Sequence, residues 1–289
     1  MSNNFHDVLK GNAFHRRFTC VGLDPDPDPD AGMIPPELSL WEDDVMKIAR
    51  LAQSVIDGAG RRAAAFKPNL GFYLRHGERG IGLLIKLIEQ IRTVAPEALV
   101  ILDCKSGDID KTAQQYAIAA FEACDADAVT VNPYMGNDAI VPFAKYASRG
   151  KGVFVLCRTS NPSAARYQDA IQQDGELLYV HVARDMVALN AEYGNIGLVV
   201  GATAREPVVR IRKTAPTLPF LLPGFGKKQG GQIPDIVPYA QTADGGGFLA
   251  NLSSDFGKAW QGQPDHSVSD GARAKIEEID AQIRQALAS

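Results

Sequence analysis

Eight short apolar segments, separated by longer amphipathic ones, set the strongest limit on the fold of this chain. The apolar segments cover residues 18–23, 63–66, 98–103, 128–131, 152–157, 196–200, 219–222 and 247–250. Apolar residues spaced three and four apart predict helices over residues 81–94, 112–123, 176–193 and 274–287. Near-continuous apolar strands are typical of a parallel sheet covered by helices. Eight such units favour an α/β fold of the closed (β/α)8 type, the TIM barrel, although the pattern also allows an open doubly wound sheet.

The chain is predicted to form one domain over residues 1–289. Its length of 289 residues is ordinary for a barrel of this type. It contains no internal repeat, low-complexity tract or clear linker. The proline–aspartate run over residues 24–30 directly follows the first predicted strand, so we interpret it as an extended loop.

Charge and composition exclude several classes of partner. The formal net charge is −4, which gives no reason to expect binding to nucleic acid or to an anionic membrane. No segment approaches the roughly 18 apolar residues of a spanning helix, and Met1 to Lys10 lack an apolar signal core. A cytoplasmic location is therefore expected. The four cysteines form no C-x-x-C pair, and the five histidines show no ligand spacing, so no metal site is predicted.

The carboxyl ends of the predicted strands carry the residues that are suited to chemistry. In a parallel barrel, active sites form at that end. Asp24 follows the first strand, Lys67 the second, and Asp103 and Lys105 end the third. Ser160 follows the fifth strand. A shared site at one end of the barrel is the prediction.

The third strand predicts a cluster of opposite charges. Asp103 and Lys105 are two residues apart, so strand alternation places both on one face. Lys67 on the neighbouring strand flanks Asp103, and Asp108 follows three residues after Lys105. In such an alternating network each charge has an opposite partner, and both lysines stay protonated. The alternative is a purely structural ion cluster, with Asp108 capping a helix.

A glycine-rich loop over residues 224–231 follows the seventh strand. Glycines let backbone N–H groups approach an anion closely, and Lys227 and Lys228 add positive charge. Phosphate sites in barrels of this type often lie after strands seven and eight. The loop is equally compatible with a flexible surface segment.

These residues also carry a family resemblance. The segment 103–112 resembles the D-x-K-x-x-D-I-x-x-T signature of orotidine 5'-phosphate decarboxylases, and Phe66-Lys67-Pro68-Asn69 resembles the segment that holds the family's other lysine. Segments 157–162 and 222–226 resemble later motifs of the family. The agreement extends in order from about Val21 to Ser254, and is closest to the longer bacterial and mycobacterial-type branch.

The resemblance implies a reaction and its catalytic groups. Orotidine 5'-phosphate would lose CO2 to give UMP, in de novo pyrimidine biosynthesis and without metal or cofactor. Lys105 would protonate C6 of the pyrimidine, and Asp103 would lie beside the departing carboxylate. Lys67 would hold Asp103 and the ribose hydroxyls, and Asp24 would contact the ribose.

The resemblance also implies the remaining substrate contacts and a partner. Ser160 would bind the pyrimidine edge. The phosphate end of the substrate would contact the segment that contains Pro223, Gly224, Gly226 and Gln229. In the family, the residues matching Asp108 and Thr112 reach into the partner subunit's site, which implies a homodimer.

One position departs from the family pattern. After the eighth strand the family has an arginine that grips the phosphate, and Asp255 stands there in this chain. Lys227, Lys228 or Lys258 would have to replace it. Two alternatives follow: a related magnesium-dependent sugar-phosphate lyase of the same barrel superfamily, or a phospho-ligand-binding protein with weakened catalysis. The lyases lack the F-K-P-N segment, and the intact charged residues argue against the second alternative.

Overall fold

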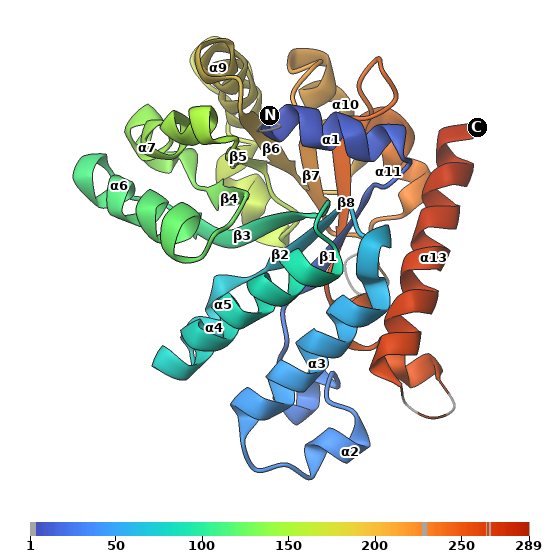
Figure 1. Cartoon of the computed structure of the whole chain (residues 1–289). Coiled ribbons are helices and arrows are strands. Elements are labelled where there is room, and N and C mark those ends of the chain that lie inside the picture. Colours follow the sequence, from blue (N-terminus) through green and yellow to red (C-terminus); the bar gives the residue numbers. More distant parts are fainter. Residues whose placement is uncertain (1–3, 227–229, 264, 266, 289) are drawn as a thin grey trace.

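The strands close into a barrel in sequence order, each one parallel to its neighbours. The computed structural model describes residues 4–226, 230–263, 265 and 267–288. The closed barrel, at the centre of Figure 1, confirms the (β/α)8 prediction and excludes the open sheet. The strands are β1 (Thr19–Leu23), β2 (Ala65–Pro68), β3 (Leu99–Ser106), β4 (Ala128–Val131), β5 (Gly152–Arg158), β6 (Ile196–Val200), β7 (Phe220–Pro223) and β8 (Phe248–Leu252).

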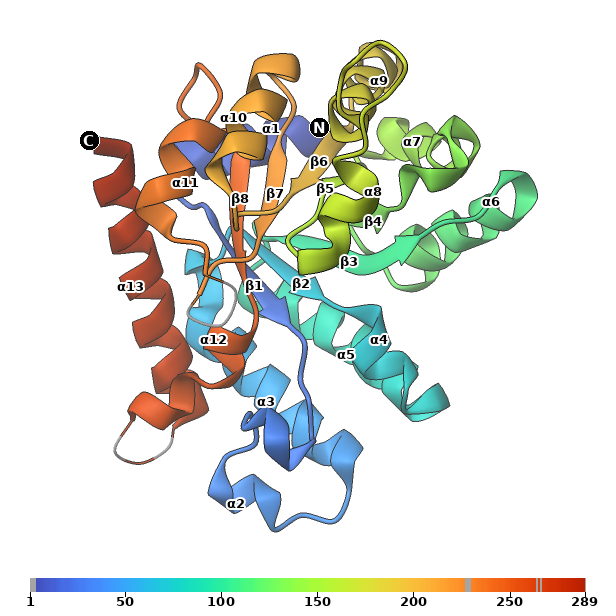
Figure 2. The same cartoon turned by 180° about the vertical axis from the view of Figure 1, so that it is seen from behind.

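Helices surround the barrel, as the two opposite views show (Figures 1 and 2). None of those in the described residues is long and apolar enough to cross a membrane. The longer ones are α1 (Phe5–Phe14), α3 (Asp44–Ala59), α5 (Gly77–Val94), α6 (Asp110–Ile118), α9 (Leu178–Tyr193), α10 (Arg205–Thr214), α11 (Ile233–Ala240) and α13 (Val268–Ala288). The short ones are α2 (Pro36–Ser39), α4 (Leu70–Leu74), α7 (Val141–Ala144), α8 (Ala165–Gln168) and α12 (Ser254–Gly257).

Five strands extend further toward their carboxyl ends than the sequence predicts, namely β2, β3, β5, β7 and β8. The second strand was expected at 63–66 and is observed at Ala65–Pro68, and the third was expected at 98–103 and runs to Ser106. Lysine and proline are weak strand formers, so propensity alone ends the strands too early. Pairing of β2 with β1, in which Lys67 lies opposite Gly22, overrides that preference. Lys67 and Lys105 therefore both lie within strands.

Several helices were not predicted, although α3 carries a clear helical pattern. Its buried residues include Ile48, Leu51, Val55 and Ile56, and this face packs toward the barrel. Asp43 caps the helix by accepting hydrogen bonds from the backbone N–H groups of the first turn. Helix α11 has a weaker signal because Pro238 lies inside it, where proline usually breaks a helix, whereas Pro234 lies in the first turn, where proline is tolerated.

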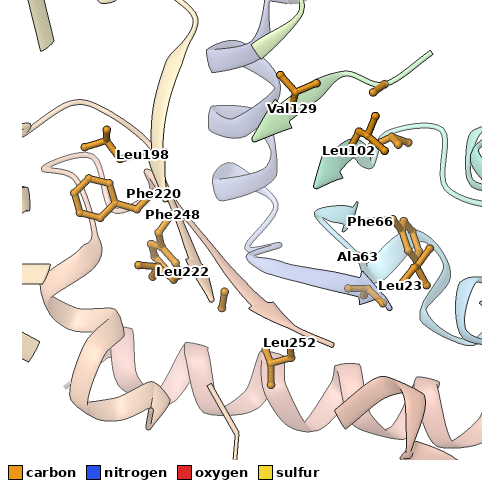
Figure 3. Close-up of a cluster of buried hydrophobic side chains, with 14 of the residues drawn as sticks. Leu23, Ala63, Phe66, Leu102, Val129, Leu198, Phe220, Leu222, Phe248 and Leu252 are labelled. Atoms are coloured by element: carbon orange, nitrogen blue, oxygen red, sulfur yellow. The ribbon is translucent and has the colours of Figure 1, made fainter. Parts of the chain in front are cut away.

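Two layers of apolar side chains form the core. The first lies between the strands and the surrounding helices and includes Phe66, Leu102 and Leu222, which are labelled in Figure 3. The second fills the barrel interior, with residues such as Ile101 and Phe154. This alternation follows from the two-residue period of a strand.

Helix α1 closes the amino-terminal end of the barrel. Phe5 is 1% exposed, and its ring meets Phe154 edge-on at 5.2 Å between centroids. The Phe5 ring also occupies the place where a side chain at Gly152 would lie. The interior is therefore filled at this end, and the open end lies at the carboxyl ends of the strands.

Candidate active site

A cavity of about 660 Å³ opens at the carboxyl ends of the strands. That volume is within the usual range of small-molecule sites. Its charged and polar strand residues, Lys67, Asp103, Thr130 and Asn251, come from β2, β3, β4 and β8. Its apolar strand residues, Leu156, Val199 and Leu221, come from β5, β6 and β7. The cavity therefore has a polar side for hydrogen bonding and an apolar side.

Three charged residues converge on the polar side, as the sequence predicts. Asp103 Oδ2 accepts a hydrogen bond from Lys67 Nζ at 2.6 Å, and Asp103 Oδ1 accepts one from Lys105 Nζ at 2.6 Å. The side chains of Lys67 and Asp103 are 4% and 7% exposed, whereas that of Lys105 is 48% exposed. The cluster thus holds two ammonium groups on one carboxylate, with one ammonium group turned toward the open cavity.

Electrostatics keep the buried pair ionised. Burial acts to lower the pKa of Lys67, but the negative charges of Asp24 and Asp103 outweigh it and hold that pKa above its usual value. Burial likewise acts to raise the pKa of Asp103, but Lys67 and Lys105 hold it well below its usual range. Asp103 is therefore a carboxylate, and Lys67 an ammonium, at neutral pH.

Thr130 connects this carboxylate to the backbone of Lys105. Thr130 Oγ1 donates a hydrogen bond to Asp103 Oδ1 at 2.8 Å and accepts one from Lys105 N at 2.9 Å. The φ of Lys105 is +48°, a left-handed conformation that is costly for a residue with a side chain. The pairing of β3 with β4 is also irregular between Leu102 and Ser106. A strained backbone at this position is held by the Thr130 hydroxyl.

Asp24 and Ser160 line the same cavity, as predicted. Asp24 Oδ1 is buried and has no hydrogen-bond partner among the described residues. Ser160 approaches Gly224 so closely that a side chain at Gly224 would lie 2.9 Å from Ser160 Cβ. Pro223, at the end of β7, lines the cavity as well. The structure therefore brings these four predicted positions together around the cluster.

The loop after β7 turns sharply at two glycines. Gly224 and Gly226 have φ values of +111° and +103°, which residues with side chains rarely adopt. The loop closes on itself, because Gly231 N donates to Gly224 O at 3.1 Å and Gly226 N donates to Gly231 O at 3.3 Å. Gln229, Lys227 and Lys228, which the sequence also places here, lie outside the described residues.

Asp255 faces this loop. Its Oδ2 lies 2.6 Å from the position that a Cβ of Gly226 would occupy, so the carboxylate packs directly on that glycine. Lys258 lies with Asp255 along a neighbouring hollow and does not line the cavity. The departure noted in the sequence is therefore located at the predicted phosphate loop.

Asp108 and Thr112 do not line the cavity of their own chain. Among the described residues, the side chain of Asp108 makes one hydrogen bond, in which its Oδ1 accepts from Ile109 N at 2.8 Å. The four-residue network proposed from the sequence therefore contains three members in the single chain. Thr112 lies on the exposed surface of α6, near the exposed side chains of Ile109 and Tyr116.

The sequence reasoning missed the polar residues that β4 and β8 contribute. Thr130 is a single hydroxyl residue within the apolar run of β4, and Asn251 ends the apolar run of β8. Ser253 and Ser254 follow Asn251 and also line the cavity. Strand alternation could have found Thr130, since it falls on the same face as Ala128 in the interior layer.

Comparisons with known proteins match most of the chain to one family. A family model described as orotidine 5'-phosphate decarboxylase / HUMPS family matches residues 19–253. The orotidine 5'-phosphate decarboxylase of Verminephrobacter eiseniae is 43% identical over 246 residues, which cover 83% of this chain and 85% of that protein. That of Polaromonas naphthalenivorans is 45% identical over 214 residues, 73% and 72% of the two chains. The solved OMP decarboxylase of Leishmania donovani has a TM-score of 0.81 and 33% identity, over 99% of this chain and 100% of that one.

Proposed function

The chain belongs to the orotidine 5'-phosphate decarboxylase family, and we propose that its Lys67–Asp103–Lys105 cluster performs the decarboxylation. The reaction converts OMP to UMP and CO2 in pyrimidine biosynthesis. The observation that carries the assignment of roles is the half-exposed ammonium of Lys105, fixed on Asp103 at the edge of the cavity.

Lys105 is the proton donor. When the bond between C6 and the carboxylate breaks, its electron pair remains on C6 and CO2 leaves. A nearby ammonium group stabilises that negative charge and then transfers a proton from Nζ to C6, which leaves a neutral amine. The 48% exposed side chain can recover its proton from solvent after product release. The proton from Lys105 takes up the electron pair left on C6, so the reaction requires no further electron acceptor.

Asp103 and Lys67 prepare the donor. Asp103 accepts from both lysines and so keeps Lys105 positioned and charged. Lys67 has two N–H groups beyond the one that it donates to Asp103. Together with Asp24, these groups are available for the ribose hydroxyls. Ser160, which also lines the cavity, is available for the pyrimidine.

A magnesium-dependent lyase reaction fits the site less well. Such an ion prefers carboxylate oxygens, but both oxygens of Asp103 already accept hydrogen bonds from ammonium groups. Among the described residues there is no group of three or more His, Cys, Asp or Glu side chains that is arranged to hold a metal ion. We propose that the reaction is cofactor-independent.

We also propose a homodimer in which Asp108 and Thr112 complete the partner's cavity. Both residues lie on or next to α6, outside their own cavity. The exposed apolar side chains of Ile109, Tyr116 and Met135 lie in the same part of the chain and suit a buried interface. A cytoplasmic location is proposed because the charged nucleotide substrate does not cross membranes unaided.

A direct ultraviolet assay tests the function. Loss of OMP absorbance should be catalysed by the wild-type protein and should persist in EDTA. The Lys105→Ala variant should remain folded and be inactive. Wild-type protein without turnover would reject the decarboxylase assignment, and activity that EDTA abolishes would favour a metal-dependent reaction instead.

A further inference from the structure

The side-chain amide of Asn251 is buried in the cavity and unpaired. Asn251 is 6% exposed, lies in β8 and lines the cavity that contains Lys67 and Asp103. Its Oδ1 is shielded from solvent without a hydrogen-bond partner, and its Nδ2 donates no hydrogen bond to any described residue. A buried amide oxygen that accepts no hydrogen bond costs free energy, and the Nδ2 group of Asn251 has two donors that no described residue uses.

The position of Asn251 suggests what would pair with it. In the sheet it lies opposite Cys20 of β1 and Pro223 of β7. It is therefore located between Asp24, which follows β1, and the glycine loop that follows β7. Asp24 Oδ1 is likewise buried without a partner.

Three adjacent strands thus present unused hydrogen-bonding groups to one side of the cavity. They are the amide of Asn251 on β8, the carboxylate of Asp24 after β1, and the remaining N–H groups of Lys67 on β2. The consecutive strands β5, β6 and β7 contribute the apolar side chains of Leu156, Val199 and Leu221. A sugar fits this arrangement, because each hydroxyl both donates and accepts, whereas a flat base suits the apolar side.

We propose that Asn251 is a substrate-binding residue whose side-chain amide hydrogen-bonds the ribose 5-phosphate half of the nucleotide. The inference rests on the function proposed above and adds a contact on β8 to those of Asp24 and Lys67. It concerns binding and not the proton transfer, because Asn251 makes no hydrogen bond to the charged cluster.

This role separates stability from binding. Asn251→Leu keeps the branched shape of the side chain and removes the amide. Because the amide is unpaired in the free protein, its removal breaks no hydrogen bond, and the unfolding midpoint should stay equal or rise. The affinity for UMP should fall about 3- to 10-fold, the effect of one neutral hydrogen bond. The value of kcat should stay within about twofold, since the contact is equal in the ground and transition states.

Asn195 supplies a matched control. It is 2% exposed, but its Nδ2 donates to Ala144 O at 3.0 Å and to Lys151 O at 2.8 Å, remote from the cavity. Asn195→Leu should lower the unfolding midpoint and leave the affinity for UMP unchanged. Asn251→Leu should therefore change the affinity for UMP without lowering stability, and Asn195→Leu should lower stability without changing that affinity.

The experiment measures UMP binding by calorimetry and competitive inhibition by ribose 5-phosphate, for the wild type and both variants. We expect Asn251→Leu to lower the affinities for UMP and for ribose 5-phosphate by the same factor. Unchanged affinity for both, or a loss confined to UMP, overturns the inference. Asn251→Ala gives the same comparison should the leucine variant fail to fold. Wild-type protein that binds UMP without decarboxylating OMP rejects the proposed function alone, whereas active protein with an unaffected variant rejects the inference alone.

Discussion

Lys67 Nζ lies 2.6 Å from Asp103 Oδ2, and neither side chain is more than 7% exposed. Burying such a pair costs desolvation energy that its mutual attraction barely repays, so stability alone does not explain the pair. Its structural consequence is that Asp103 is held as a carboxylate in a fixed orientation. The second oxygen of Asp103 then positions Lys105, which has side-chain surface open to the cavity.

Lys105→Ala should abolish turnover without unfolding the protein. The variant removes the proton donor, so kcat should fall by roughly 10³- to 10⁴-fold or more. Asp103 keeps its bond to Lys67, and the unfolding midpoint should change little. Steady-state kinetics and thermal denaturation measure the two effects. Lys86→Ala, an exposed lysine on α5, is the control and should retain full activity. Near-normal turnover in Lys105→Ala would contradict the assigned role.

Thr130→Val should reduce kcat through the position of Lys105. The substitution keeps the β-branched shape and removes the hydroxyl that bonds both Asp103 and the backbone of Lys105. Without it, the left-handed backbone of Lys105 loses a constraint. We expect kcat to fall about tenfold, with a stability loss of about 1–2 kcal/mol. Thr130→Ser restores the hydroxyl and should recover most of kcat, whereas equal losses in both variants would indicate a packing role.

The charged cluster could be predicted from the sequence because it depends on a single rule of the fold. Parallel strands of a closed barrel bring their carboxyl ends together, so Lys67, Asp103 and Lys105 meet once the strands are recognised. The parallel sheet follows from the apolar runs that bury both faces of each strand, and eight such units favour its closure into a barrel. Neither step requires knowledge of side-chain orientation beyond strand alternation.

The remaining site residues depend on features that sequence patterns do not show. Strand alternation places Thr130 on the interior face, but its hydrogen bonds to Asp103 and Lys105 depend on how β4 pairs with β3. The unpaired state of Asn251 Oδ1 depends on every neighbouring donor. The sequence included Asp108 in the charged network, but that residue does not line the cavity of its own chain, and a partner chain is implied only by the resemblance. Helix α11 was missed because it is short and Pro238 interrupts the helical pattern.

The stability of the protein should depend on pH through Asp103 and Lys67. The pKa of Asp103 is lowered by the two lysines, so its contribution is present above its usual pKa of about 4 and is lost as pH falls. The pKa of Lys67 is raised, so its contribution is present below about pH 10 and is lost as pH rises. Stability should therefore decrease from about pH 5 downward.

Asp103→Asn tests this dependence. It leaves the buried Lys67 ammonium without its hydrogen-bonded counter-charge, so the free energy of unfolding at pH 7 should fall by about 3 kcal/mol. The acid limb of the stability profile should also become flatter than that of the wild type. Urea denaturation between pH 3 and pH 8 measures both effects. An acid limb as steep as that of the wild type would mean that other carboxylates control acid unfolding.

Asp255→Arg should lower the KM for OMP. The carboxylate of Asp255 packs on Gly226 in the loop that we assign to the phosphate, where a negative charge repels the dianion. Asp255→Asn removes the repulsion alone and should lower KM less than arginine does. Asp185→Arg is the control, because this exposed carboxylate on α9 undergoes the same change of charge and lines neither the cavity nor the hollow that contains Asp255. An unchanged or higher KM in Asp255→Arg would show that Asp255 does not face the phosphate.

Mixing two inactive variants should restore activity if Asp108 serves the partner's cavity. Lys105→Ala removes the donor from its own site, and Asp108→Ala would disable the site of the other subunit. A mixed dimer then has one site with both residues altered and one site with both intact. Random exchange makes half of the dimers mixed, so activity should recover to about a quarter of the wild-type value. Subunits are exchanged at low protein concentration and assayed after reassociation. If each site were formed within a single subunit, every chain in the mixture would lack either Lys105 or Asp108, and all sites would stay inactive. No recovery of activity despite proven subunit exchange would therefore place Asp108 in the site of its own chain.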